Sequence, residues 1–122
     1  MKINKYQDLI VWKKAIEYTV KVYEMTKKFP AEEKFGLVGQ INRAAVSIPS
    51  NVAEGAGRDS RKEFSQFLSI ALGSSYEAET QLILSCRLGF ISNSELNILS
   101  DMSNEIQKMI VGSKKSLITK LN

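Results

Sequence analysis

The sequence predicts an all-α fold, an antiparallel up-down bundle of four helices. Three observations support it: apolar residues recur at helical spacing in four segments, helix-breaking or capping residues separate the segments, and the connections are short. Short connections between long helices place consecutive helices side by side and antiparallel. With 122 residues and no internal repeat, the chain is expected to form a single four-helix-bundle domain over residues 1–122.

The first expected helix covers residues 8–28 and stops before Pro30, because a residue that precedes proline is disfavoured in a helix. Its apolar residues cover an arc of about 220°, against about 100° for a one-sided stripe. Charged residues fill the remaining arc and form i,i+4 partners such as Lys13 and Glu17. We therefore expect this helix to be covered on two sides.

The second expected helix begins after Pro30 and carries an apolar stripe from Leu37 to Val52. Pro49 lies inside the stripe, so we expect a second helix that is kinked or broken at Pro49. Gly55 and Gly57 follow at positions favoured for a left-handed helix cap.

A polar stripe on the same helix repeats at i+3/i+4 spacing and consists of Gln40, Arg43, Ser47, Asn51, Glu54 and Arg58. Two interpretations stay open. In one, these groups form hydrogen bonds across a subunit interface or to the backbone carbonyl that Pro49 leaves free. In the other, the arginines contact phosphates.

Two Ser-x-x-Glu capping boxes, at residues 60–63 and 92–95, open the third and fourth expected helices. Between Phe64 and Cys86 the only charged residues are Glu77 and Glu79, and Glu79 is expected to need an Arg or Lys partner. A helix that is apolar nearly all round is buried nearly all round, so its outward face should meet another chain. The expected homo-oligomer interface comprises Leu72, Tyr76, Ile83, Ile70, Leu84 and Leu88.

The composition argues against catalysis. Histidine is absent and Cys86 is the only cysteine, which removes the commonest general base, the commonest zinc ligand and any cysteine metal cluster. Glu77 and Glu79 diverge by about 160° on a helix, so they cannot share one reacting atom. We expect no catalytic residue, no metal and no cofactor. Without a long apolar run or a signal peptide, we expect a cytoplasmic protein with no membrane partner.

Charge is uneven along the chain, because residues 1–62 hold twelve Lys and Arg against seven Asp and Glu. A basic first half attracts polyanions such as RNA or DNA. The candidate nucleic-acid-binding residues are Arg43, Arg58, Arg61, Lys62, Lys13 and Lys14.

Three stretches resemble the signatures of one family: residues 8–15 (DLIVWKKA), residues 35–37 (FGL) and, most specific, residues 43–58 (RAAVSIPSNVAEGAGR). The chain is similar here to the four-helix-bundle proteins of 23S rRNA intervening sequences, which are related to the accessory variability determinant of diversity-generating retroelements. The resemblance implies a ring-shaped homopentamer with no established enzymatic activity. It also implies nucleic acid and a reverse transcriptase as partners.

Two hypotheses follow. In the first, the protein is a non-enzymatic homo-oligomeric scaffold that binds RNA or DNA through its basic residues. In the second, it is a protein–protein adaptor with no nucleic-acid role.

Overall fold

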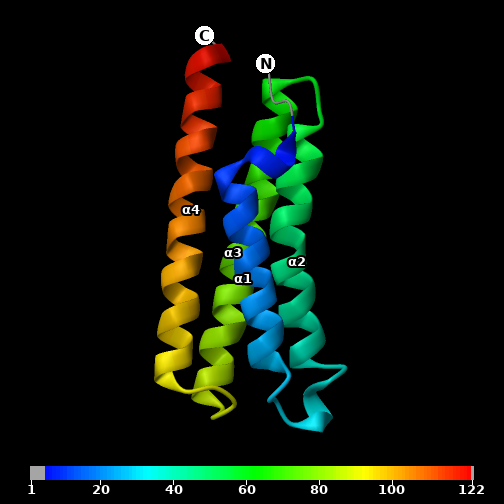
Figure 1. Ribbon diagram of the computed structural model, residues 1–122, viewed down its shortest axis with the longest axis vertical. Coiled ribbons are helices and arrows are strands. Elements are labelled where there is room, and N and C mark those ends of the chain that lie inside the picture. The colour runs from blue at the N-terminus through cyan, green and yellow to red at the C-terminus, as the bar shows by residue number, and fades with distance from the viewer. Residues whose placement is uncertain (1–4, 122) are drawn as a thin grey trace.

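The computed structural model describes residues 5–121, and the side chains of residues 5–117. It is an all-α four-helix bundle, as the sequence predicts, and consecutive helices run in opposite directions (Figure 1). The helices are α1 (Ile10–Thr26), α2 (Leu37–Ala56), α3 (Arg61–Arg87) and α4 (Asn93–Leu121). Two short 3-10 turns, η1 (Tyr6–Asp8) and η2 (Ala31–Glu33), precede α1 and α2. Residues 1–4 and 122 of the expected domain lie outside the described residues.

Each helix of the bundle packs against two others. α1 packs against α2 and α4, and α3 packs against the same two helices from the other side. In the part of the chain that the structure describes, the backbones of α1 and α3 do not come close, so the two helices occupy opposite corners of the bundle. Each helix therefore keeps an outward side that no other helix of the same chain covers.

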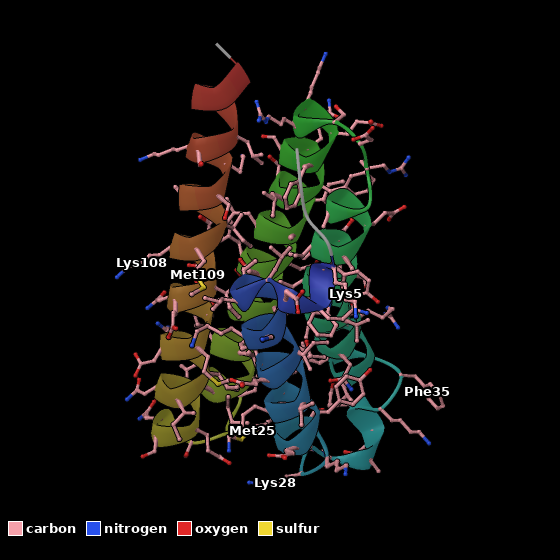
Figure 2. All side chains as sticks on the ribbon, turned by 45° about the horizontal axis from the view of Figure 1, so that its top comes forward. Lys5, Met25, Lys28, Phe35, Lys108 and Met109 are labelled. Atoms are coloured by element: carbon pink, nitrogen blue, oxygen red, sulfur yellow. The ribbon has the colours of Figure 1, made fainter. Side chains whose placement is uncertain are left out.

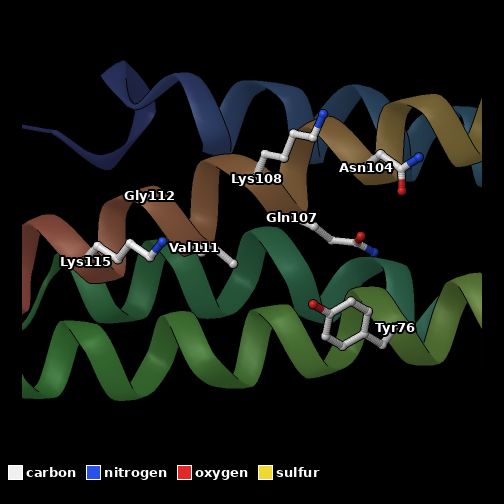
Figure 3. Close-up of a pocket in the computed structure, with 7 residues that line it drawn as sticks. All are labelled: Tyr76, Asn104, Gln107, Lys108, Val111, Gly112 and Lys115. Atoms are coloured by element: carbon white, nitrogen blue, oxygen red, sulfur yellow. The ribbon is translucent and has the colours of Figure 1, made fainter.

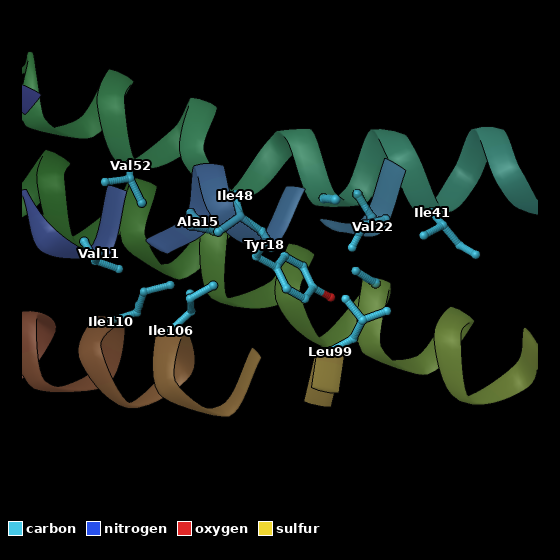
Figure 4. Packing of buried hydrophobic residues seen from close by; sticks show 14 of the residues in the cluster. Val11, Ala15, Tyr18, Val22, Ile41, Ile48, Val52, Leu99, Ile106 and Ile110 are labelled. Atoms are coloured by element: carbon cyan, nitrogen blue, oxygen red, sulfur yellow. The ribbon is translucent and has the colours of Figure 1, made fainter. Parts of the chain in front are cut away.

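The core lies along the bundle axis, where each helix contributes one stripe (Figure 4). Its largest fully buried apolar side chains are Ile41, Ile48, Leu68, Leu82, Leu99, Ile106 and Ile110. Burying one such side chain contributes about 1.5–3 kcal/mol, and this is the main source of bundle stability. Tyr18 is also fully buried, and its hydroxyl has no hydrogen-bond partner among the described residues. Burial, and secondly the charge of Glu79, raise the pKa of Tyr18 above its ordinary value.

The second helix starts later than the sequence predicts. Pro30 is followed by η2 and a turn, and α2 begins only at Leu37. Gly36 precedes α2 with a non-helical backbone (φ −106°, ψ −109°), and the Glu33 carboxylate accepts a hydrogen bond from the N–H of Leu37 at 3.4 Å. A side-chain acceptor thus caps α2 six residues after the place where the sequence pattern put its start.

Pro49 does not break α2, which continues through it from Leu37 to Ala56. Proline lacks an N–H, so the carbonyl of Ala45, four residues earlier, loses its helical donor. The hydroxyl of Thr19 on α1 lies 3.1 Å from that carbonyl and 2.8 Å from the carbonyl of Ala15, so its proton is shared between them. α1 therefore supplies the missing donor, and a kink at Pro49 stays a prediction.

Both predicted serine caps are present, and the capping box with its reciprocal bond is complete at the start of α4. The Ser60 hydroxyl accepts the N–H of Glu63 at 3.2 Å. At the start of α4, the Ser92 hydroxyl accepts the N–H of Glu95 at 3.1 Å, and the Glu95 carboxylate accepts the N–H of Ser92 at 2.9 Å.

The left-handed cap expected at Gly55 or Gly57 is wrong. Gly57 has φ −77°, and the glycine with a positive φ is Gly89, at 84°, after α3. Gly55 lies inside α2 and is buried, and a Cβ placed on it would lie 2.6 Å from the Cβ of Phe67. The glycine is needed for close helix packing, not for a turn.

No helix in the described part of the chain combines the length and the apolar character that a membrane crossing requires.

Candidate functional site

The outward side of α3 carries the residues that the sequence predicts as an oligomer interface. Five of them are 42–54% exposed and Leu72 is half-buried. Their exposure follows from the packing, since α3 contacts only α2 and α4. We call this surface the α3 face: Ile70, Leu72, Tyr76, Ile83, Leu84 and Leu88.

Gly73 lies in the middle of the α3 face and is exposed. A Cβ placed on it would meet no atom within 4 Å. Glycine inside a helix is less favourable than alanine by about 1 kcal/mol, and nothing within the chain requires it at this position. Because Gly73 has no side chain, the backbone of another helix can approach α3 closely at this flat spot.

One edge of the α3 face borders an open groove of about 460 Å³ between α3 and α4 (Figure 3). Tyr76 lies on the α3 side, and Asn104, Gln107 and Lys108 line the α4 side. The sequence analysis did not single out these α4 residues, because polar positions on an amphipathic helix look alike from the pattern alone.

The six candidate nucleic-acid residues do not form one patch. Three of them, Arg58, Arg61 and Lys62, gather at the turn between α2 and α3. Arg58 is engaged there, since its guanidinium lies 3.3 Å from a Glu54 oxygen and 5.1 Å from the centre of the Phe67 ring.

The other three candidates lie apart from that turn. Arg43 precedes Arg58 by fifteen residues, about 22 Å along the axis of α2. The ammonium of Lys14 lies 2.6 Å from Glu105 of α4. This hydrogen-bonded ion pair raises the pKa of Lys14 above its ordinary value. Lys13 is exposed, and the expected pair with Glu17 does not form among the described side chains.

Three members of the polar stripe of α2, Gln40, Ser47 and Asn51, lie on the side of the helix that meets α3 of the same chain. The hydroxyls of Ser47 and Ser74 lie 2.8 Å apart, and the Gln81 amide donates to Gln40 at 3.4 Å. Asn51 donates to the carbonyl and hydroxyl of Ser47. These polar groups thus join two helices within one chain, and it is Thr19 that satisfies the carbonyl freed by Pro49.

Within one chain Glu79 has no cationic partner among residues 5–117, so the expected Arg or Lys stays a prediction for a contact between copies. Its carboxylate accepts the hydroxyl of Ser103 at 3.0 Å, and the Gln107 amide donates to the same hydroxyl. Ser103 is buried on α4, so the contact that the chain itself supplies to Glu79 is a hydroxyl. Within residues 5–117, no group of three His, Cys, Asp or Glu residues is arranged to hold a metal ion.

Two further groups of exposed apolar side chains were not predicted as sites. Phe35, in the connection before α2, is 91% exposed and points away from the bundle (Figure 2), with Lys34 5.5 Å from its ring centre. α1 packs against α2 and α4, but part of its broad apolar arc stays uncovered in the single chain: Ile16, Val20 and Tyr23 are 37–54% exposed.

Comparison with known proteins gives a family model and several similar solved structures. The family model described as 23S rRNA-intervening sequence protein matches residues 7–112. A protein of unknown function from the S23 ribosomal protein family of Bacteroides thetaiotaomicron has a crystal structure with a TM-score of 0.79 and 28% sequence identity. That match covers 87% of this chain and 99% of the other. None of the curated proteins compared with the chain matches it.

Proposed function

Because the chain belongs to the family of 23S rRNA-intervening sequence proteins, we propose that it is a non-enzymatic homo-oligomeric scaffold built from identical four-helix bundles. The α3 face carries this proposal, since five large apolar side chains on one helix stay 42–54% exposed in the single chain. Exposed apolar side chains that gather on one side of a helix mark an interaction surface, whereas singly scattered ones need no explanation. The assembly we propose is the ring of five copies that the family resemblance implies.

Gly73 gives the proposal a sharp test, because Gly112 is a matched control. Both are exposed helix glycines, and a Cβ on either would meet no atom within 4 Å. In an isolated chain, alanine at either position raises helix stability by about 1 kcal/mol. In the assembly, Gly73→Ala places a methyl group between packed copies and weakens association about tenfold or more. Gly112→Ala, on the α4 side of the groove beside the α3 face, weakens association much less than Gly73→Ala does.

Sedimentation velocity over a dilution series measures this difference. The wild-type protein and Gly112→Ala are expected to sediment as one assembled species. On dilution, Gly73→Ala is expected to dissociate at protein concentrations at which the other two are still assembled. A folded wild-type monomer at every concentration would overturn the proposal, and so would equal association of the two variants.

Nucleic-acid binding is the second candidate, favoured by the three basic residues at the α2–α3 turn. RNA or DNA would bind through their charge, so affinity should fall steeply with salt as counterions are released. Filter binding of single-stranded RNA and DNA tests this, with Arg61→Gln/Lys62→Gln compared against Lys108→Gln. The double variant is expected to bind more weakly than the control, and absence of wild-type binding at about 50 mM salt rejects the candidate.

The alternative is a protein–protein adaptor with no nucleic-acid role. It predicts no nucleic-acid binding at low salt and a protein partner that stays bound after nuclease treatment. A reverse transcriptase, the protein partner that the resemblance implies, is the first to test by co-purification.

A further inference from the structure

The bundle has a second apolar surface, on the side of α1 and α2. A groove of about 300 Å³ runs between these helices, with Trp12 and Ile16 on one wall and Val46 and Ala53 on the other. Ile16 and Val46 are 37% and 39% exposed. We call this surface the α1–α2 groove. It is separate from the α3 face, because α1 and α3 occupy opposite corners of the bundle.

The two surfaces have complementary shapes. The α3 face is the outside of one helix, so it is convex, and Gly73 leaves a flat spot within it. The α1–α2 groove lies between two helices and is concave. Helices pack by placing the side-chain ridge of one into a groove on another. A convex face therefore fits the groove better than it fits a second convex face.

Their charges are also complementary. Glu77, in the middle of the α3 face, has no ion pair among residues 5–117, and its polar contact is a 3.5 Å hydrogen bond from the Gln81 amide. The charged residues one helical turn from Ile16 and Val46 are Lys13 and Arg43. Neither cation has an ion pair among the described residues. By helical position, Lys13 lies just beyond Val20 on the side of α1 away from α2, and Glu24 and Glu17 lie slightly farther round.

We propose that the α1–α2 groove of one copy receives the α3 face of the next copy, with Glu77 among the basic side chains of its neighbour. This inference rests on the proposed homo-oligomeric function and names the surface that the α3 face meets. Two α3 faces packed together would instead bring two Glu77 carboxylates close and leave both grooves uncovered. Contact between unlike surfaces makes the assembly directional, so that it closes into a ring or continues as a filament.

Two single variants separate these arrangements. Leu84→Arg places a charge on the α3 face and Ile16→Arg places one in the α1–α2 groove, each at an exposed position that the fold does not need. Each is expected to lower the association constant at least about 100-fold, because it buries an unpaired charge between copies. Ile98→Arg is the matched control, since Ile98 is 48% exposed on α4, outside both surfaces.

The decisive measurement is mixing, followed by mass photometry or sedimentation. Each variant alone should be a folded monomer by circular dichroism, and an equimolar mixture should form a 1:1 dimer through the one unmodified groove and the one unmodified α3 face. The Ile98→Arg control should assemble like the wild type. If Ile16→Arg fails to fold, Val46→Arg replaces it.

The contrary outcomes are distinct. If Ile16→Arg assembles like the wild type, or if the mixture stays monomeric, the groove is not the partner surface, while the α3 face can still mediate assembly. If the wild type itself is monomeric, the proposed function fails, and this inference fails with it.

Discussion

Near the end of α2, Gly55 lies at the closest approach between α2 and α3. A Cβ there would be 2.6 Å from the Cβ of Phe67 and 3.0 Å from the Phe64 ring, which is shorter than van der Waals contact. From the sequence pattern this glycine is interpreted as a helix end, because a helix end and a close contact between helices both favour a residue without a side chain. Only the packing separates the two.

Gly55→Ala should lower the free energy of unfolding by about 1–3 kcal/mol, because the added methyl group forces α2 and α3 apart. Urea unfolding followed by circular dichroism measures the change. Gly112→Ala, where the added methyl group meets nothing within 4 Å, should instead stabilise the protein by up to about 1 kcal/mol. Equal stability of the two variants would contradict close packing at Gly55.

Thr19 is the residue that lets a proline occupy the middle of a buried helix. Its hydroxyl lies 3.1 Å from the carbonyl that Pro49 leaves without a helical donor. The sequence analysis foresaw the free carbonyl but not its donor, because the donor lies 26 residues from Ala45, on another helix.

Thr19→Val keeps the shape of the side chain and removes the hydroxyl, so the Ala45 carbonyl loses its partner. The free energy of unfolding should fall by about 1–3 kcal/mol. Thr19→Ser, which keeps the hydroxyl, should lose clearly less. Thermal unfolding of the three proteins at one concentration tests this, and a valine variant as stable as the wild type argues against the role.

Among the elements, α3 and α4 could be predicted best, because their starts are encoded locally. A capping box needs only a serine and a glutamate three positions apart; Ser60 and Ser92 both cap their helices, and Glu95 completes the box at α4. The start of α2 was predicted six residues too early. Glutamates favour a helix start, but they also fit the turn and η2 that precede α2 here. Ion pairs between elements, such as Lys28 with Glu95 at 2.8 Å, leave no local signal.

The Lys28–Glu95 pair ties the end of α1 to the start of α4 and makes stability depend on pH. The hydrogen bond from Lys28, followed by the one from the Ser92 N–H, lowers the pKa of Glu95 from 4.5 to about 2. Its contribution to stability is thus complete above pH 4.5 and is lost as pH falls from 4.5 toward 2.

Replacing Lys28 with methionine should raise the pKa of Glu95 toward 4.5, its ordinary value. Carbon-detected NMR titration of the Glu95 carboxyl group measures this directly. A pKa that does not change on the substitution would show that the Ser92 N–H alone accounts for the shift.

At the scale of the whole molecule, one bundle leaves two unlike apolar surfaces uncovered. The sequence predicted the first, because α3 carries few charges, and it predicted that α1 has more apolar surface than one core needs. It did not locate the α1–α2 groove, because the walls of the groove come from two helices whose relative rotation is set by packing.

If the copies assemble as proposed, the melting temperature should rise with protein concentration, because association stabilises the folded state by mass action. Differential scanning fluorimetry over a hundredfold concentration range measures this. The monomeric Leu84→Arg variant should melt at one temperature throughout. A wild-type melting temperature that is independent of concentration would count against assembly.

The turn between α2 and α3 lies at one end of the bundle, together with the described ends of the chain (Figure 1). In a closed assembly every copy presents this turn in an equivalent position. A molecule that binds the turn therefore meets the same weak site several times. A polymer long enough to reach several sites gains avidity, because each contact after the first forms at a high local concentration. A modest basic turn on one small domain could thereby hold a long anionic chain firmly while each individual contact stays rapidly reversible.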